Sequence, residues 1–113
     1  QKYFEFLMLL HTVNKSAFDN SALDDCLAVV SPNNAILLIE NGVYGALDNS
    51  PSELAHIKNI KQLSASGTRF YVLQADCEAR GLNSTALLAA FKTVDDAGFV
   101  ALAAEASAIQ SWY

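Results

Sequence analysis

The sequence predicts a single α/β domain, a three-layer sandwich in which helices cover a mostly parallel sheet of about five strands. Short apolar runs alternate with segments of helical periodicity along the whole chain. The apolar runs contain few alternating polar residues, which is typical of strands that are covered on both faces. At 113 residues the chain is long enough to bury about two thirds of its unfolded surface in one domain.

The first half of the domain is expected to begin with a strand over residues 6–13, a nearly unbroken apolar run. A polar turn leads to a helix that Asn20 or Ser21 can cap, and Ser21 and Asp24 have the spacing of a capping box. The second strand, over residues 35–40, is rich in branched side chains and is expected at the centre of the sheet.

One face of the first helix carries a cysteine, Cys26. This face is formed by Leu23, Cys26, Leu27 and Val30. Cys26 therefore points toward the core, or toward a partner packed over that side. Either it is a small buried hydrophobic residue, or it is a reactive thiol near a helix N-terminus. The neighbouring Asp24 and Asp25 raise the pKa of a thiol, which favours the buried interpretation.

The middle of the chain predicts a short helix or turn over residues 43–47 and a helix over residues 51–63. The glycines of the first segment lack the spacing and the lysine of a phosphate-binding loop, so nucleotide binding is disfavoured. His56 lies off the apolar stripe of the helix, and we expect it to be in contact with solvent.

A third strand is expected over residues 69–74, followed by a short acidic turn or helix that Gly81 closes. Cys77 lies in this segment between Asp76 and Glu78, which disfavour a thiolate. The pattern predicts an incidental surface or half-buried thiol at Cys77.

The last third of the chain predicts a helix over residues 86–90, capped by residues 83–85. A short strand over residues 92–95, a helix that Asp96 caps and an aromatic strand over residues 108–113 complete the domain.

The amino-acid composition limits the classes of function that the chain can have. Hydrophobic residues make up 52% of the chain and charged residues 17%, which suggests that apolar surface is buried in an assembly. The net charge of −5 argues against direct binding of nucleic acid. Two cysteines without C-x-x-C spacing support neither a zinc site nor a thioredoxin-like motif, and no cofactor is expected.

The first apolar run is too short to span a membrane, and the absence of a secretory signal together with the few cysteines predicts a cytoplasmic protein. Met8 is a plausible natural start, so the domain is expected over residues 8–113, with residues 1–7 as an N-terminal extension left over from expression.

Three stretches together resemble one known family. LLHTVNKSAF with Cys26 after it, AILLIENGVYGAL, and the closing GFVALAAEASAIQSWY are similar to the DsrH/TusB family, and the turn at residues 79–81 agrees. The similarity extends from Met8 to the end of the chain. Cys26 falls where DsrH-type members carry a cysteine, so the resemblance leans toward DsrH.

The resemblance implies a small Rossmann-like fold and a role in sulfur relay. Such proteins assemble with DsrE/TusD-like and DsrF/TusC-like subunits into a dimer of heterotrimers, which passes persulfide sulfur to a DsrC/TusE-like carrier. DsrH-type complexes serve sulfur oxidation, and TusB-type complexes serve 2-thiouridine formation in tRNA. The main sulfur-carrying cysteine belongs to the DsrE/TusD-like subunit.

Three roles therefore stay open at this point. Cys26 is a candidate persulfide carrier in a sulfurtransferase complex. His11 and Lys15 lie at the end of the first strand, where they could steady a thiolate, although a core or interface histidine and a solvated lysine are the favoured interpretations. Alternatively, the chain is a purely structural subunit of that complex. An independent ligand-binding α/β domain is the weakest alternative, because the chain has no phosphate-cradling loop.

Overall fold

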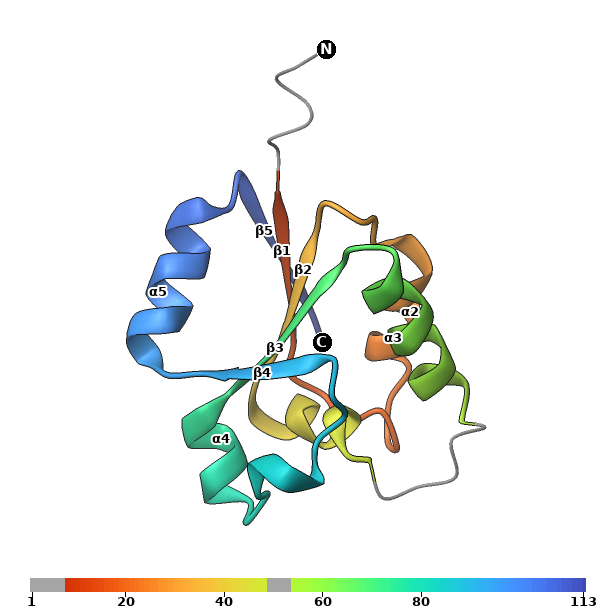
Figure 1. The fold of residues 1–113 in the computed structure, drawn as a ribbon, viewed down its shortest axis with the longest axis vertical. Coiled ribbons are helices and arrows are strands. Elements are labelled where there is room, and N and C mark those ends of the chain that lie inside the picture. Colours follow the sequence, from red (N-terminus) through yellow and green to blue (C-terminus); the bar gives the residue numbers. More distant parts are fainter. Residues whose placement is uncertain (1–7, 49–53) are drawn as a thin grey trace.

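A computed structural model describes residues 8–48 and 54–113 and shows a five-stranded, fully parallel sheet (Figure 1). Its order is β4-β3-β2-β1-β5. The strands are β1 (Leu9–Val13), β2 (Ala35–Leu38), β3 (Arg69–Leu73), β4 (Phe91–Val94) and β5 (Ala108–Trp112). The α/β fold class is confirmed, and β2, the most apolar strand, lies at the centre of the sheet as expected.

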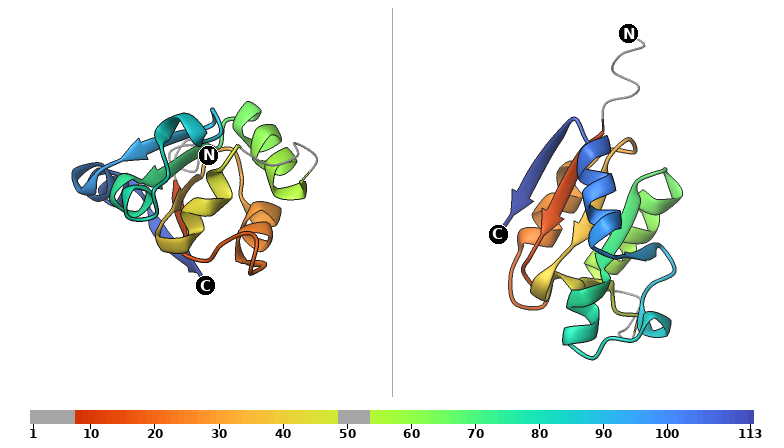
Figure 2. Two further views of the ribbon diagram at one scale, coloured as in Figure 1. Left: turned by 90° about the horizontal axis from the view of Figure 1, so that it is seen from below. Right: turned by 90° about the vertical axis from the view of Figure 1, so that its left-hand side faces the viewer.

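Helices lie on both faces of this sheet, which gives the three layers (Figure 2). On one face lie α2 (Ala22–Val29) and α3 (Ala55–Ala65), and on the other lies α5 (Asp96–Glu105). Three short elements gather beyond the carboxyl ends of the strands: α4 (Gln74–Ala79) and the 3₁₀ helices η1 (Glu40–Ala46) and η2 (Ser84–Ala86).

The two faces carry cores of different size. The larger core lies between the sheet and α2 and α3; its buried members include Val13, Leu23, Cys26, Ile36, Leu38, Ile57, Ile60, Phe70 and Val72. The smaller core lies under α5; its buried members are Met8, Leu10, Ala35, Leu37 and Leu102. The α5 side of the sheet is therefore the less completely covered side.

The start of α2 differs from the expected capping box. Ser21 is the N-cap residue but makes no side-chain capping bond. Instead, the side-chain oxygen of Asn20, one residue earlier, accepts a hydrogen bond from the backbone N–H of Ala22 at 2.6 Å. The hydroxyl of Ser21 donates to the carboxylate of Asp25 at 3.2 Å, and Asp24 takes no part.

The prediction of a helix over residues 86–90 is wrong. Only the single turn η2 forms, capped by the side chain of Asn83, and the chain then extends. The backbone N–H of Leu88 donates to the carbonyl of Ala46 at 2.7 Å, and Leu87 pairs with Leu47 in an antiparallel bridge. Contacts with a segment distant in sequence therefore override the local helix propensity.

Candidate functional site

Cys26 lies in the middle of α2 and faces the sheet. Its side chain is 0% exposed and belongs to the larger core, together with Leu23 and Leu27 from the same helix. The expected apolar face is confirmed, and it packs against this chain's own sheet rather than against a partner. The thiol is therefore out of reach of another protein's cysteine while α2 stays folded.

Burial raises the pKa of the Cys26 thiol to about 12. At pH 7 only roughly one molecule in 100,000 would carry the thiolate, which is the form that attacks a persulfide sulfur. The backbone carbonyl of Cys26 accepts a hydrogen bond from the backbone N–H of Val30 at 3.1 Å, which closes the end of α2. Both the packing and the protonation state suit a structural residue.

His11 lies on β1, on the α2 side of the sheet, and both of its ring nitrogens are engaged. The indole Nε1–H of Trp112 donates to His11 Nδ1 at 3.1 Å, and His11 Nε2 lies 3.1 Å from the side-chain oxygen of Asn34. An indole N–H can only donate, so Nδ1 must accept and Nε2 carries the proton. The His11 side chain is 4% exposed and is held between Trp112 of β5 and Asn34 in the loop before β2. Since both ring nitrogens are already bonded, His11 is not a hydrogen-bond partner of the Cys26 thiol. Lys15 is exposed.

The strand order reverses beside β1, and in such sheets ligands bind near the carboxyl ends of the strands on either side of that point. Here the backbone N–H of Asn14 donates to the carbonyl of Trp112 at 3.5 Å. The side-chain Oδ1 of Asn14 is buried and has no hydrogen-bond partner among the residues that the structure describes.

The segment after β2 is packed tightly onto the end of β1. A Cβ atom at Gly42 would lie 2.0 Å from the carbonyl oxygen of Val13, so only glycine fits at that position. The backbone N–H of Glu40, whose φ is 52°, donates to the carboxylate of Asp76 at 2.6 Å. Asn41 accepts from Arg80 at 2.9 Å, which ties η1 to α4. The short helical turn expected here is confirmed.

Cys77 is buried, not exposed or half-buried as expected from its acidic neighbours. It is 3% exposed and lines a pocket of about 250 Å³ beyond the carboxyl ends of β3 and β4. Burial raises the pKa of this thiol, Asp76 and Glu78 raise it further, and Arg80 lowers it in part. The expectation failed because α4 forms a full helical turn that rotates Cys77 inward.

His56 is also buried, at 7% exposure, where solvent contact was expected. Its ring makes an edge-on contact with Phe18, with centroids 5.5 Å apart. Burial lowers the pKa of His56, and the charge of Asp24 opposes that shift. Its Nε2 atom is buried without a partner in the described part of the chain. The exposed Phe18 comes from the loop before α2, so no local pattern around residue 56 could reveal this contact.

The described residues, 8–48 and 54–113, hold no cluster of three or more His, Cys, Asp or Glu side chains that could bind a metal ion. None of the described helices is long and apolar enough to cross a membrane. The chemically reactive side chains are therefore two thiols and two imidazoles, and all four are buried in the fold: Cys26, Cys77, His11 and His56.

Comparisons with known proteins agree with the sequence resemblance. The family model described as "DsrH like protein" matches residues 15–109. The protein named TusB from Pectobacterium parmentieri is 35% identical over 74 residues, which cover 66% of this chain and 70% of that protein.

Two solved structures share the fold. The ychN protein from E. coli superposes with a TM-score of 0.80 over 93% of this chain and 98% of that one, at 14% identity. MTH1491 from Methanobacterium thermoautotrophicum, described as a protein of unknown function, has a TM-score of 0.71 and 14% identity over 92% of this chain and 98% of that one. At such low identity these likenesses concern the fold alone.

Proposed function

Because this chain belongs to the DsrH/TusB family, we propose that it is a subunit of a cytoplasmic sulfur-relay complex, in which its role is architectural. The observation that carries the architectural part is the complete burial of Cys26 in the chain's own core. The sulfur-carrying cysteine then belongs to a partner subunit, of the DsrE/TusD-like kind that the resemblance implies.

The surface of the chain supports a role in assembly. Helix α5 is apolar along most of its length, yet Leu102 is its one side chain that is buried in the described structure. A helix that is apolar on all sides is usually covered by protein. Strand β5, at the edge of the sheet, has four of its five residues exposed, and Ile109 is 51% exposed. Both elements fit a subunit that other subunits cover.

We propose DsrE/TusD-like and DsrF/TusC-like subunits as the partners, in a dimer of heterotrimers, and a DsrC/TusE-like protein as the sulfur acceptor. The pathway has two candidates. The position of Cys26 and the matching family model favour a DsrH-type role in sulfur oxidation. The TusB relative favours 2-thiouridine formation in tRNA. For a role in tRNA thiolation, the net charge of −5 argues that other components of the pathway contact the tRNA.

The alternative role for Cys26 is that of a persulfide carrier. It would require α2 to open, because the thiol must reach both solvent and a donor sulfur before attack. Opening would expose the apolar face that Leu23 and Leu27 share with Cys26. Binding of a partner would have to supply the free energy for such an opening.

The test is intact-mass analysis of the complex co-purified with its two partner subunits, before and after treatment with a sulfur donor. Cys26→Ala is compared with the unsubstituted chain. We expect a sulfur adduct on a partner subunit, none on this chain, and equal sulfur transfer by the variant. A sulfur adduct on this chain that Cys26→Ala abolishes would make Cys26 a carrier and overturn the architectural role. Failure to co-purify with either partner would overturn membership of the complex.

A further inference from the structure

The α5 side of the sheet is only half covered, and the open half lies over β3 and β4. Parallel strands normally have helices on both faces. Helix α5 covers β1 and β2, where Leu10 and Leu37 are fully buried. The connection from β3 to β4 consists of α4 and η2, which lie beyond the carboxyl ends of the strands and not over this face (Figure 1). Helix α5 reaches this half of the sheet only along its edge, through Phe99 and Glu105, and no other helix of the described chain covers it.

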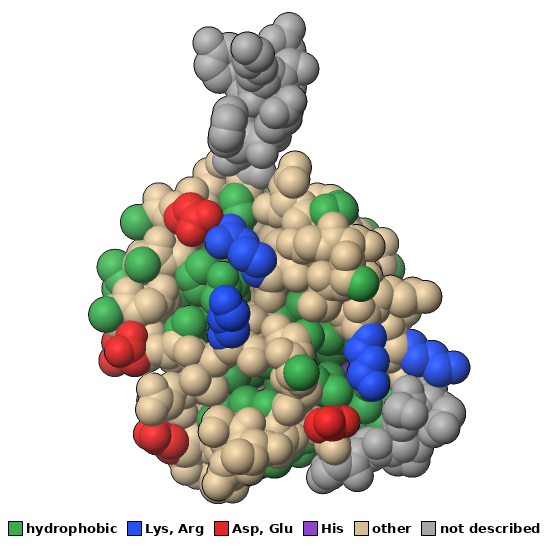
Figure 3. Space-filling model, in the orientation of Figure 1, with side chains coloured by type: hydrophobic (Ala, Val, Ile, Leu, Met, Phe, Trp, Pro, Cys, Tyr) green, Lys and Arg blue, Asp and Glu red, His purple; other side chains and the backbone are tan. Residues whose placement is uncertain are grey.

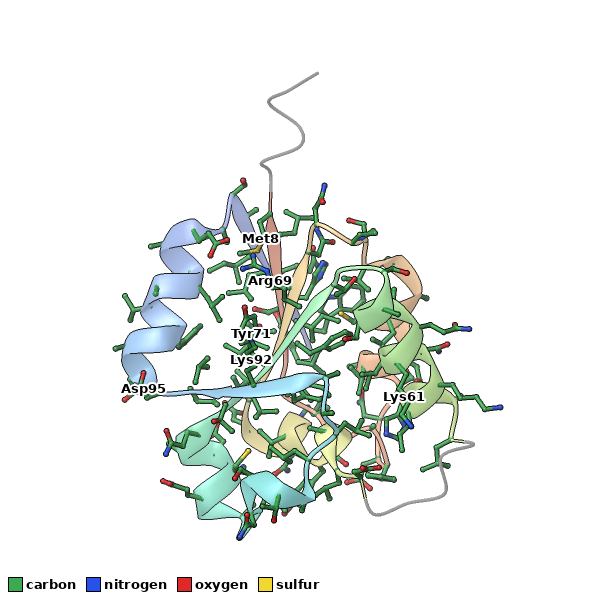
Figure 4. All side chains as sticks on the ribbon, viewed as in Figure 1. Met8, Lys61, Arg69, Tyr71, Lys92 and Asp95 are labelled. Carbon is green, nitrogen blue, oxygen red and sulfur yellow. The ribbon has the colours of Figure 1, made fainter. Side chains whose placement is uncertain are left out.

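The register fixes which side chains form the open surface. Phe70 pairs with Phe91, and both belong to the larger core on the α3 side. The next pair, Tyr71 and Lys92, therefore points to the α5 side. Figure 4 shows Arg69, Tyr71 and Lys92 following one another on this side. We call the surface formed by Arg69, Tyr71, Leu73, Lys92, Val94 and Phe99 the open face.

The open face combines apolar and cationic side chains. Tyr71, Val94 and Phe99 are half-buried and pack against the smaller core, so each leaves part of its apolar surface in solvent. Lys92 is exposed, and no ion pair of its ammonium group is found within residues 8–48 and 54–113. In Figure 3 two basic side chains lie near each other over this part of the sheet, with hydrophobic surface beside them.

Arg69 is held in place at the end of this surface. One of its guanidinium nitrogens donates to the carboxylate of Glu105 on α5 at 2.9 Å, and both side chains are about half exposed. A guanidinium has five N–H donors, so this bond leaves donors for a second carboxylate. A pocket of about 250 Å³ at the amino ends of β3 and β4 is lined by Arg69, Tyr71 and Lys92 together with residues of the turn between α3 and β3. The two cations border this pocket in a chain whose net charge is −5.

We propose that the open face binds an amphipathic helix of a partner subunit, whose carboxylates pair with Arg69 and Lys92 and whose apolar side chains cover Tyr71, Val94 and Phe99. Because the open face carries the cations of Arg69 and Lys92, a partner helix with acidic side chains is complementary to it in charge. A helix fits better than an added strand, because β4 is a short edge strand and bears a lysine, which disfavours strand pairing. The helix would lie beside α5, at the usual separation of about 8–10 Å.

This inference deepens the proposed function and rests on it, since the partner is a subunit of the same complex. A second copy of this chain is a less suitable occupant, because its own open face would bring the same two cations. The surface also differs from the exposed edge of β5, which lies at the opposite end of the sheet.

The test is carbodiimide cross-linking of the complex with its two partner subunits. Carbodiimide joins an amine to a carboxylate only where the two groups are in contact. We expect Lys92 to be joined to an Asp or Glu of a partner. Lys92→Arg keeps the charge and should lose this cross-link while the complex still forms. The exposed Lys58 and Lys61 on α3 are the matched control, and Lys58→Arg with Lys61→Arg should leave the cross-link of Lys92 unchanged.

Charge reversal adds a measurement of affinity. Arg69→Glu with Lys92→Glu should raise the dissociation constant of the complex about tenfold or more, while Lys58→Glu with Lys61→Glu should change it about twofold at most. A complex that forms while Lys92 links only within its own chain, or to a second copy, would overturn the inference and leave the proposed function standing. Absence of any complex would overturn both.

Discussion

The indole of Trp112 donates a hydrogen bond to Nδ1 of His11 at 3.1 Å, across 101 positions of sequence. The bond joins the last strand to the first, and it fixes the tautomer of His11 so that Nε2–H faces Asn34. Through these two hydrogen bonds His11 connects β1, β5 and the loop before β2. Neutral hydrogen bonds therefore hold the middle of β1 to its neighbours on both sides, which makes the network a structural clamp.

We expect Trp112→Phe to lower the free energy of unfolding by about 1 kcal/mol or more, because it leaves the Nδ1 lone pair of His11 without a donor and removes apolar contacts. Urea denaturation followed by circular dichroism measures the loss. Tyr113→Phe is the control: Tyr113 is 81% exposed, and its substitution should change stability by less than about 0.5 kcal/mol. Equal midpoints for the two variants would contradict the clamp.

Cys26→Ser should destabilise the chain more than Cys26→Ala, by about 1 kcal/mol or more. The serine hydroxyl would be buried among apolar side chains without a partner, whereas alanine only leaves a small void. Denaturation midpoints of the two variants give the difference. If serine were tolerated better than alanine, the site would contain a hydrogen-bonding partner or water, and its description as an apolar site would be wrong.

Stability should fall at alkaline pH because of Cys26. The thiol has a pKa of 9.0 in an unfolded chain and about 12 in the folded one, so between these values the folded state keeps a proton that the unfolded state releases. The unfolded state then binds fewer protons, and the contribution of Cys26 falls by roughly 1.4 kcal/mol per pH unit in this window. Denaturation at pH 8 to 11 of the unsubstituted chain and of Cys26→Ala isolates the effect. Parallel curves would contradict it.

His56 should make the chain sensitive to acid. Burial lowers its pKa below the ordinary 6.5, so as pH falls through that range the unfolded state takes up a proton that the folded state resists. Stability present above pH 6.5 is therefore lost as the pH falls. His56→Leu should reduce this loss between pH 7.5 and pH 5, as followed by urea midpoints. Asp24→Asn should steepen it, because the charge of Asp24 raises the pKa of His56.

Gly42→Ala should be strongly destabilising, by about 2 kcal/mol or more, because the new Cβ would overlap the carbonyl oxygen of Val13 and force η1 away from β1. Gly81→Asn is the matched control. Gly81 has φ 68° with nothing within 4 Å of an added Cβ, and asparagine tolerates that conformation. Thermal unfolding of both variants tests the contrast. A mild effect at Gly42 would mean that η1 can shift.

Local patterns predicted most of the fold. The apolar runs of β1, β2 and β3 have enough length and branching to identify strands without tertiary information, and β5 was identified from its aromatic end. The spacing of Leu23, Cys26 and Leu27 also predicted the buried face of α2 correctly. The errors at residues 86–90 and at His56 share one cause, because each depends on a contact with a segment distant in sequence. The error at Cys77 has a local cause, since the helical turn of α4 brings this side chain inward.

For this protein the sequence by itself determined the α/β class, the central position of β2 and the family, because hydrophobic periodicity and the order of short motifs are properties of the chain. Only the tertiary structure decided that Cys26 is sealed in the chain's own core, that His11 is held by Trp112 and Asn34, and that β3 and β4 leave one face open. The physical reason is that desolvation and hydrogen-bond partners arise from packing between distant segments, which no local spacing encodes.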